Sequence, residues 1–272
     1  MIIGKAISPF GIKRRNGGGG GNDADAQAFI TASGISGTNA TAINTLVVNL
    51  KSANIWTKMK AVYPMVGSTA TSCKWNLKNP VDSNAAYRLV FSGGGTFSAN
   101  GYLPNGTNAY ANTFFTPATN GLLNSAHISF YSRTNVAAAA VVIGSNNAGP
   151  NYYYTTLSPR NLSGQCVNAI NENTGEVFTT ANSLGLFTTN RQSATDYDVW
   201  KNSTKEINTT KSSLGQSNFP ITIGALNGAG SLANYATNQC AFASIGDGLT
   251  DAEALAFYNA VQTFNTTLGR QV

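Results

Sequence analysis

CAFASIGDGLTDAEALAFYNAVQTFNTTLGR, residues 240–270, carries the clearest structural signals in this chain. Its first seven residues form a short run, closed by glycine, that is typical of a β-strand. Thr250 and Glu253 then have the spacing of a capping box, in which the hydroxyl accepts from the third amide and the carboxylate reaches back. Apolar residues follow at helical spacing: Ala254, Phe257, Val261, Phe264 and Leu268. Gly269 stops this pattern, so we predict a strand followed by a helix over residues 251–267.

Upstream of this ending, the chain is a series of short runs rich in Val, Ile, Tyr, Phe and Thr. The runs are separated by Gly, Asn, Pro and Ser clusters, including Asn-Gly turn signals at 105–106, 120–121 and 227–228. The predicted strands include residues 87–91, 127–134, 139–144, 151–157, 175–180, 197–202 and 220–226. So many short strands at this spacing indicate a mainly β fold, either a sandwich or a barrel.

Helical signals precede the strands. Asp23 or Asp25 can cap the segment AQAFITAS, and Asn39 can cap a second segment. Apolar residues of this second segment recur at helical spacing as far as Ile55 and Met59, and Ser52 and Asn54 can divide it into two pieces. We therefore divide the chain into an arm (1–22), a helical segment (23–66) and a β-domain with its C-terminal helix (67–272).

The arm ends in KRRNGGGGGND, residues 13–23. Lys13, Arg14 and Arg15 are followed by five consecutive glycines, whose composition is that of a flexible linker. We interpret residues 1–22 as a basic docking arm, joined through a hinge to the rest of the chain. Such a peptide can add as a strand to the sheet edge of a partner.

Charge and cysteine content narrow the class of protein. Only 10% of the residues are charged, and the net charge of +6 is not concentrated in a basic stripe interleaved with aromatic residues, so we expect no nucleic-acid partner. Cys73, Cys166 and Cys240 are widely spaced and odd in number, which argues against a zinc site or a disulfide framework. We expect buried thiols in a chain assembled in a reducing cytoplasm, with no membrane span and no signal peptide.

The ending NQCAFASIGDGLTDAEALAFY, residues 238–258, resembles the last strand and helix of laminin-G-like, concanavalin A-like domains. The family's Leu-[Ser/Thr]-Asp-x-Glu step corresponds to residues 249–253, and Tyr258 closes the helix. FSANGYLPNGTNAYANTFFTP, AHISFYSRTN and YDVWKNSTKEIN are similar to the family's opening hairpin, next core strand and later hairpin. This resemblance covers roughly residues 85–260. It implies a concanavalin A-like antiparallel β-sandwich, or jelly roll, with N-terminal helices and a C-terminal helix.

The whole chain also resembles virion proteins of tailed bacteriophages, especially of Bacteroidetes hosts. The matching text is DADAQAFITASGISGTNATAINTLVVNLKSANIWTKMKAVYPMVGST near the start and TTLGRQV at the end. The resemblance implies a structural component of the particle: a fibre, or a tail- or capsid-attached protein. Other virion proteins and copies of the same chain would be its partners, and the virion, assembled in the bacterial host cytoplasm, would be its location.

Tyr152, Tyr153 and Tyr154 form the richest aromatic cluster. Tyrosines at a sandwich edge can stack on sugar rings while their hydroxyls form hydrogen bonds, so we name these three as candidate ligand-binding residues. Alternation along a strand would expose either Tyr153 alone or Tyr152 together with Tyr154. The competing interpretation is that the cluster only supplies packing area.

Asp196 and Asp198 alternate on a predicted strand, so both side chains can lie on one face and hold Ca²⁺. The competing interpretation is a solvated face opposite Tyr197 and Val199. We expect no other cofactor.

We predict no catalytic residues. Glu172 and Glu176 lack the Asp of the laminarinase-type Glu-x-Asp-x-x-Glu motif and are better explained by a turn between two strands. His127, the single histidine, begins a predicted strand and is expected to be structural. The sequence thus favours a non-enzymatic virion component. The alternative is an adhesin that binds host surface polysaccharide, and a polysaccharide depolymerase is less favoured.

Overall fold

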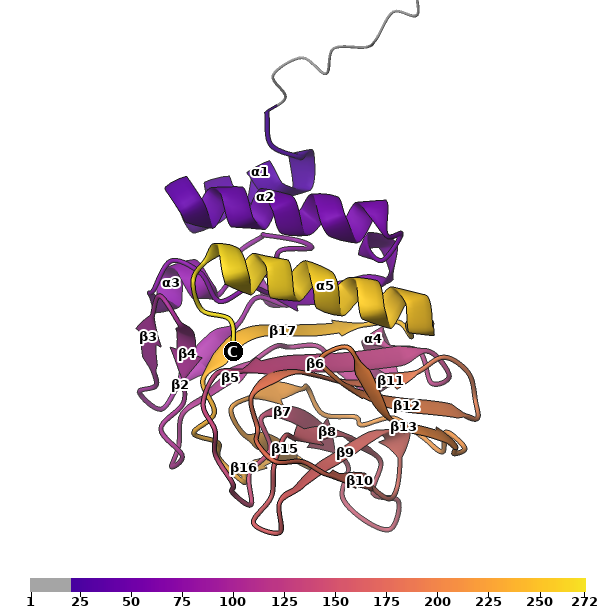
Figure 1. Cartoon of the computed structure of the whole chain (residues 1–272). Helices are drawn as coiled ribbons and strands as arrows, with labels where there is room; N and C mark the ends of the chain where they lie inside the picture. The colour runs from indigo at the N-terminus through magenta and orange to yellow at the C-terminus, as the bar shows by residue number, and fades with distance from the viewer. Residues whose placement is uncertain (1–20) are drawn as a thin grey trace, which may run out of the picture.

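Two antiparallel β-sheets face each other, and a layer of helices covers the outer face of one of them (Figure 1). This computed structural model describes residues 21–272. The predicted docking residues Lys13, Arg14 and Arg15 lie outside that range. The mainly β fold, the antiparallel sandwich and the helices at both ends of the domain are confirmed.

The first sheet lies under the helices. Its strands occur in the order β13 (Thr204–Thr210), β12 (Asp196–Lys201), β11 (Gly185–Arg191), β6 (Ala126–Ser132), β17 (Cys240–Gly246), β4 (Gly101–Leu103) and β3 (Thr96–Ser98), with β1 (Met59–Tyr63) also paired to β17. β13 is an edge strand that carries a β-bulge: Val199 pairs with Ile207 and Trp200 with Lys205, so Glu206 has no residue opposite it.

The second sheet has one face toward the first sheet. Its strands occur in the order β10 (Glu176–Thr179), β9 (Gln165–Glu172), β8 (Tyr154–Ser158), β7 (Ile143–Asn146), β14 (Thr222–Ile223), β5 (Tyr110–Asn112) and β2 (Val90–Ser92). A small hairpin of β15 (Leu226–Gly228) and β16 (Ser231–Ala233) attaches to β7, and the β15–β7 pairing is parallel.

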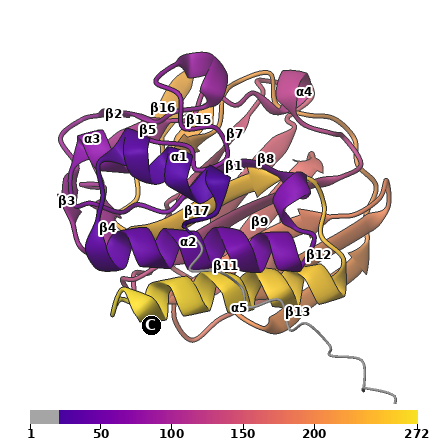
Figure 2. The same cartoon turned by 90° about the horizontal axis from the view of Figure 1, so that it is seen from above.

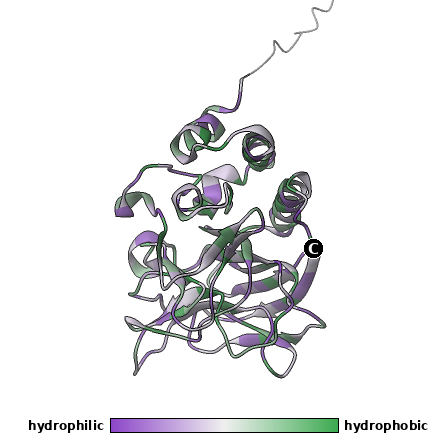
Figure 3. Cartoon of the chain, turned by 90° about the vertical axis from the view of Figure 1, so that its left-hand side faces the viewer, coloured by the Kyte–Doolittle hydropathy of each residue, from purple (hydrophilic) through white to green (hydrophobic). Residues whose placement is uncertain are grey.

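The helical layer consists of α1 (Ala24–Ser33), α2 (Gly37–Ser52) and α5 (Asp251–Thr267). Figure 2 shows α2 and α5 lying side by side above the sheet, and Figure 3 shows the layers from the side. Short elements complete the fold: η1 (Trp56–Lys58), α3 (Ala70–Cys73), η2 (Asn84–Ala86) and α4 (Pro117–Asn120). None of the helices in the described part of the chain combines the length and apolarity needed to cross a lipid bilayer.

The helix termini show which sequence signals operate. Asp23 caps α1 by accepting from the amide of Asp25, and the predicted capping box of Thr250 and Glu253 opens α5. α5 ends just before Gly269, whose φ of 64° lies in the left-handed region that glycine tolerates. The predicted Asn39 cap is wrong, because α2 already begins at Gly37 with Ser36 as its cap residue.

The helical spacing does not continue to Met59. α2 ends at Ser52, and residues 59–63 form β1, which pairs with β17. Met59 and Val62 of β1 pack in the helix-side core, whereas Ala61 and Tyr63 pack in the core between the sheets. Because both faces of β1 are buried, apolar and polar residues do not alternate along it as they do along a half-exposed strand. The sequence pattern therefore placed these residues in the helical segment.

Arg270 fixes the end of the chain to the sandwich. Its side chain is almost fully buried, and it donates to the backbone oxygens of Pro64 at 2.6 Å, Ala241 at 2.7 Å and Met65 at 2.9 Å. Its Nε also donates to Asn265 Oδ1 at 2.9 Å. Burial lowers the pKa of this guanidinium to about 10, so it remains charged at neutral pH. The charge is stabilised by carbonyl dipoles of two segments, residues 64–65 and Ala241, that are distant from each other in sequence.

Replacing Arg270 with Lys is therefore expected to lower the free energy of unfolding by about 3 kcal/mol, because an ammonium group cannot reach all of these acceptors and leaves buried carbonyls unpaired. Urea unfolding followed by circular dichroism measures the change. Arg160→Lys is the control, since Arg160 Nε has no hydrogen-bond partner within residues 21–272. Equal losses in the two variants would contradict the assigned role of Arg270.

Candidate functional site

The outer face of the second sheet carries an open groove along β8. Alternation along this strand buries Thr155 and Leu157 and leaves Tyr154, Thr156 and Ser158 partly exposed. On the neighbouring strand β9, Val167 is partly exposed and pairs with Ser158. Small and hydroxylated side chains thus line the floor of the groove.

Two clefts make up this groove, which we call the β8 groove. The larger, of about 400 Å³, is lined by Tyr154, Thr156, Val167, Ala169, Asn173, Thr174 and Gly175. The smaller, of about 230 Å³, is lined by Ala138, Ala139, Ala140, Val141, Ser158, Asn161, Val167 and Asn234. The clefts share Val167 and therefore lie next to each other on the outer face of the sheet. No lining residue is charged, although amide, hydroxyl and phenol groups are present throughout.

The predicted tyrosine cluster divides between two sides. The rings of Tyr152 and Tyr154 stack with their centroids 6.2 Å apart and their planes 15° apart. Tyr152 is 50% exposed, and Tyr154 lines the groove. Tyr153 turns away and packs on Gly215, where a Cβ would come within 2.3 Å of its ring. Of the two alternation patterns, the structure adopts the one that presents Tyr152 with Tyr154.

The predicted calcium ligands Asp196 and Asp198 do lie on one face of β12, opposite Thr210 and Asn208 of β13. That face is not open, because Asp198 is fully buried and forms an ion pair of 3.2 Å with Lys205. Burial raises the pKa of Asp196, and the neighbouring charge of Asp198 adds to the shift. Within residues 21–272, no group of three or more His, Cys, Asp or Glu side chains is placed to hold a metal ion. The assignment of Ca²⁺ to this pair stays a prediction.

Glu172 and Glu176 flank the turn between β9 and β10, as the sequence predicts. Both carboxylates bind Lys211, whose Nζ lies 2.5 Å from Glu172 and 2.7 Å from Glu176. Burial raises the pKa of Glu172, although the ion pair with Lys211 opposes the shift. The two acids thus share one lysine, and neither lines the β8 groove.

His127 lies in a fully buried hydrogen-bond chain on the helix side of the first sheet. Its Nε2 is 3.0 Å from Ser244 Oγ, its Nδ1 is 2.7 Å from the backbone oxygen of Asp247, and Ser129 Oγ is 2.7 Å from Ser244 Oγ. Phe257 of α5 covers the imidazole. A serine and a histidine at this distance resemble a nucleophile and its base. All three side chains are buried, however, so a substrate cannot reach them.

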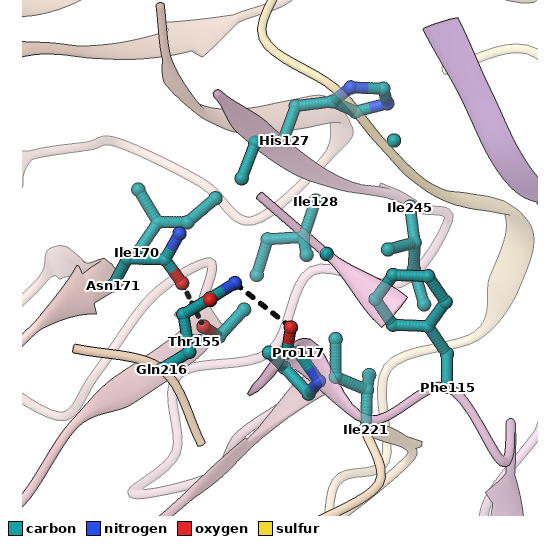
Figure 4. A pocket seen from close by; sticks show the side chains of 13 residues that line it. Phe115, Pro117, His127, Ile128, Thr155, Ile170, Asn171, Gln216, Ile221 and Ile245 are labelled. Atoms are coloured by element: carbon teal, nitrogen blue, oxygen red, sulfur yellow. Dashed lines mark hydrogen bonds between the residues drawn. The ribbon is translucent and has the colours of Figure 1, made fainter. Parts of the chain in front are cut away.

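A small cavity lies inside the sandwich (Figure 4). Phe115, Ile128, Ile221 and Ile245 line it, and Gln216 Nε2 donates to the backbone oxygen of Pro117 at its edge. Its volume of about 20 Å³ has room for about one water molecule. A sugar ring does not fit there. Two open clefts of about 340 Å³ each, one between α2 and α5 and one beside the α1–α2 loop, have no aromatic side chain in their lining. The β8 groove, which has one, is therefore the candidate site.

Sequence reasoning found the aromatic end of the groove but missed most of its lining. The segment 138–141 and the turn 173–175 contribute small residues that carry no chemical signal of their own. They become neighbours only because β7, β8 and β9 pair in sequence order. The one available clue was the abundance of Asn and Thr in turns beside predicted strands.

Solved structures with a similar fold include a domain of an arabinanase and a sialidase. Domain 4 of AbnA, a GH43 extracellular arabinanase from Geobacillus stearothermophilus solved in complex with arabinotriose, matches with a TM-score of 0.51 and 12% identity, over 74% of this chain and 98% of that domain. A Trypanosoma rangeli sialidase mutant displaying trans-sialidase activity matches with a TM-score of 0.52 and 10% identity. That match covers 82% of this chain but only 39% of the sialidase.

At such identities, the likeness shows the fold alone, an antiparallel β-sandwich. No protein-family model and no curated protein sequence matches this chain.

His127 provides a pH-dependent test of the buried chain. Burial lowers its pKa to about 4, below the ordinary value near 6.5, so the unfolded state takes up the proton first as the pH falls. Stability is therefore present above pH 6.5 and lost toward pH 4, by about 3 kcal/mol. Urea unfolding at pH 7 and 4.5 measures this loss, which should be largely absent in His127→Gln. An equal loss in the variant would assign the effect to carboxylates instead.

Proposed function

We propose that this chain binds an uncharged polysaccharide through the β8 groove. The observation that carries the proposal is the composition of the groove: stacked tyrosines at one end, then Thr, Ser, Ala and Val side chains with Asn161, Asn173 and Asn234 among them. Sugar rings pack on aromatic faces, and their hydroxyls bond to amides and hydroxyls. The groove offers both kinds of contact and no charge.

Charge is scarce elsewhere on the described surface as well. Nine of the eleven acidic residues form ion pairs, and the two without one within residues 21–272 are Asp196 and Glu206. A surface of this kind exerts little long-range attraction on a charged ligand. This favours a neutral host surface glycan over an acidic one.

Binding without hydrolysis is the better-supported form of the proposal. Glycoside hydrolases place two carboxyl groups on either side of the scissile bond, and the lining of the β8 groove contains none. The arabinanase domain with the same fold was solved with arabinotriose bound, which makes a glycan a reasonable ligand class to test first. A depolymerase remains the less favoured alternative.

Tyr152→Ala is expected to weaken glycan binding at least about 10-fold, which corresponds to about 1.4 kcal/mol of lost contact. Thr156→Trp should abolish binding by filling the floor of the groove. A glycan array with purified protein, with and without Ca²⁺, identifies the ligand, and calorimetry then measures the affinity. Leu255→Ala, on the exposed side of α5, is the control and should bind like the unaltered protein. Full affinity in Tyr152→Ala and Thr156→Trp would place the site elsewhere.

We further propose that the chain is a structural component of a bacteriophage particle, assembled in the host cytoplasm and present in multiple copies. The support is the resemblance of its N- and C-terminal segments to virion proteins, together with the basic arm and its glycine run. The arm would anchor the chain to other virion proteins, and the sandwich would face outward as a lectin-like module. Multiple copies make a modest affinity per groove sufficient for adhesion to a host.

Deletion of residues 1–21 is expected to abolish incorporation of the chain into particles while the isolated protein stays folded, because the deletion ends before Asp23, the cap of α1. Mass spectrometry of purified particles from a complementation experiment measures incorporation, and circular dichroism checks the fold. Wild-type incorporation of the truncated chain would contradict an anchoring role for the arm.

A further inference from the structure

One wall of the β8 groove is the turn between β9 and β10, formed by Asn173, Thr174 and Gly175. Such a turn is held at its two ends by the strands. Within residues 21–272, its one side-chain hydrogen bond from outside β9 and β10 comes from Lys211, whose Nζ donates to the backbone oxygen of Thr174 at 2.8 Å.

Lys211 follows the last residue of β13, so this contact joins the edges of the two sheets. Its Nζ also binds the carboxylates at both ends of the turn, Glu172 at 2.5 Å and Glu176 at 2.7 Å. The same ammonium group thus reaches the beginning, the middle and the end of the turn. It also lies 5.8 Å from the ring centroid of Tyr197, inside the sandwich.

The backbone of Lys211 is fixed as firmly as its side chain. Its amide donates to the backbone oxygen of Thr195 at 2.8 Å, and its carbonyl accepts from Arg191 Nη1 at 2.6 Å. Arg191 is fully buried and also donates to the backbone oxygen of Ile170 on β9, at 3.2 Å. The cluster therefore holds two cations and two carboxylates, with Glu172 and Arg191 entirely inside. A buried set of opposite charges persists only in one close geometry, because any displacement leaves an unpaired charge.

We propose that Lys211 is a positioning residue that fixes the β9–β10 turn and thereby sets the width of the β8 groove. It touches no lining side chain and would act only through the placement of residues 173–175. The placement itself follows from contacts within the chain, whereas its effect on ligand affinity rests on the proposed glycan binding.

Lys205 provides a matched control. It lies on β13, the edge strand that Lys211 directly follows, and its side chain is 19% exposed against 18% for Lys211. It likewise binds one buried carboxylate and one exposed carboxylate, Asp198 at 3.2 Å and Asp251 at 2.5 Å. These contacts lie on the helix side, away from the groove. Lys205→Met and Lys211→Met therefore each remove the cation from one buried acid, but only the second frees the turn.

The test combines hydrogen exchange with glycan binding on the full chain. Lys211→Met is expected to raise amide exchange at residues 176–178, which pair with β9 directly after the turn, at least about 10-fold and to weaken glycan binding by a similar factor, whereas Lys205→Met changes neither. The double variant Lys211→Met/Glu172→Gln removes the stranded buried carboxylate and so separates positioning from folding. It should regain stability but keep the fast exchange and the weak binding.

Unchanged exchange at residues 176–178 in the double variant would overturn the positioning role. Fast exchange combined with unaltered glycan affinity would also overturn it, since the turn would then not shape the site. If the unaltered chain binds no glycan on the array, the proposed function fails. Exchange still decides whether Lys211 holds the turn.

Discussion

Phe242 of β17 lies under α5, while Ala243 beside it faces the second sheet, and this double burial organises the whole structure. β17 pairs with β6, β4 and β1, so it is the strand through which the helical layer and the sandwich share one sheet. A strand of this kind must be apolar on both faces. Ser244 is the polar side chain of β17, and its burial is tolerated because its hydroxyl forms a hydrogen bond with His127 of the neighbouring strand β6. Arg270 then fastens the end of the chain to carbonyls of the same region.

The sequence predicted those parts of the fold that depend on neighbouring residues. The capping box of α5, the glycine after it and the turn between Glu172 and Glu176 are local signals, and each appears where expected. β1 was assigned to the helical segment because a short apolar run buried on both sides has no distinguishing period. Its identity depends on pairing with β17, about 180 residues later in the chain, which no local pattern can reveal.

The candidate site shows the same division. Tyr152 and Tyr154 were visible in the sequence because aromatic clusters are rare and chemically distinct. The walls formed by residues 138–141 and 173–175 were not visible, since small residues acquire a role only from the surfaces they bring together. Lys211 was also missed. Its importance comes from three contacts with one turn, made from the edge of the opposite sheet.

The ion pairs of this protein mainly hold distant segments of the chain together, and they leave few unpaired acids on the surface. Lys51, Lys58, Lys205 and Lys211 each tie together segments that are distant in sequence or in layer, and together they engage most of the acids. The outer surface is consequently rich in amides and hydroxyls. Such a surface stays hydrated without attracting ions, which suits a protein whose candidate ligand is neutral.

The bulge at Glu206 affects how the edge strand β13 can meet a neighbouring molecule. β13 is a seven-residue edge strand and would otherwise offer a straight row of backbone donors and acceptors to any neighbouring chain. The extra residue interrupts that row and places a carboxylate at the interruption. The bulge therefore opposes edge-to-edge pairing of β13 with a strand of a neighbouring molecule.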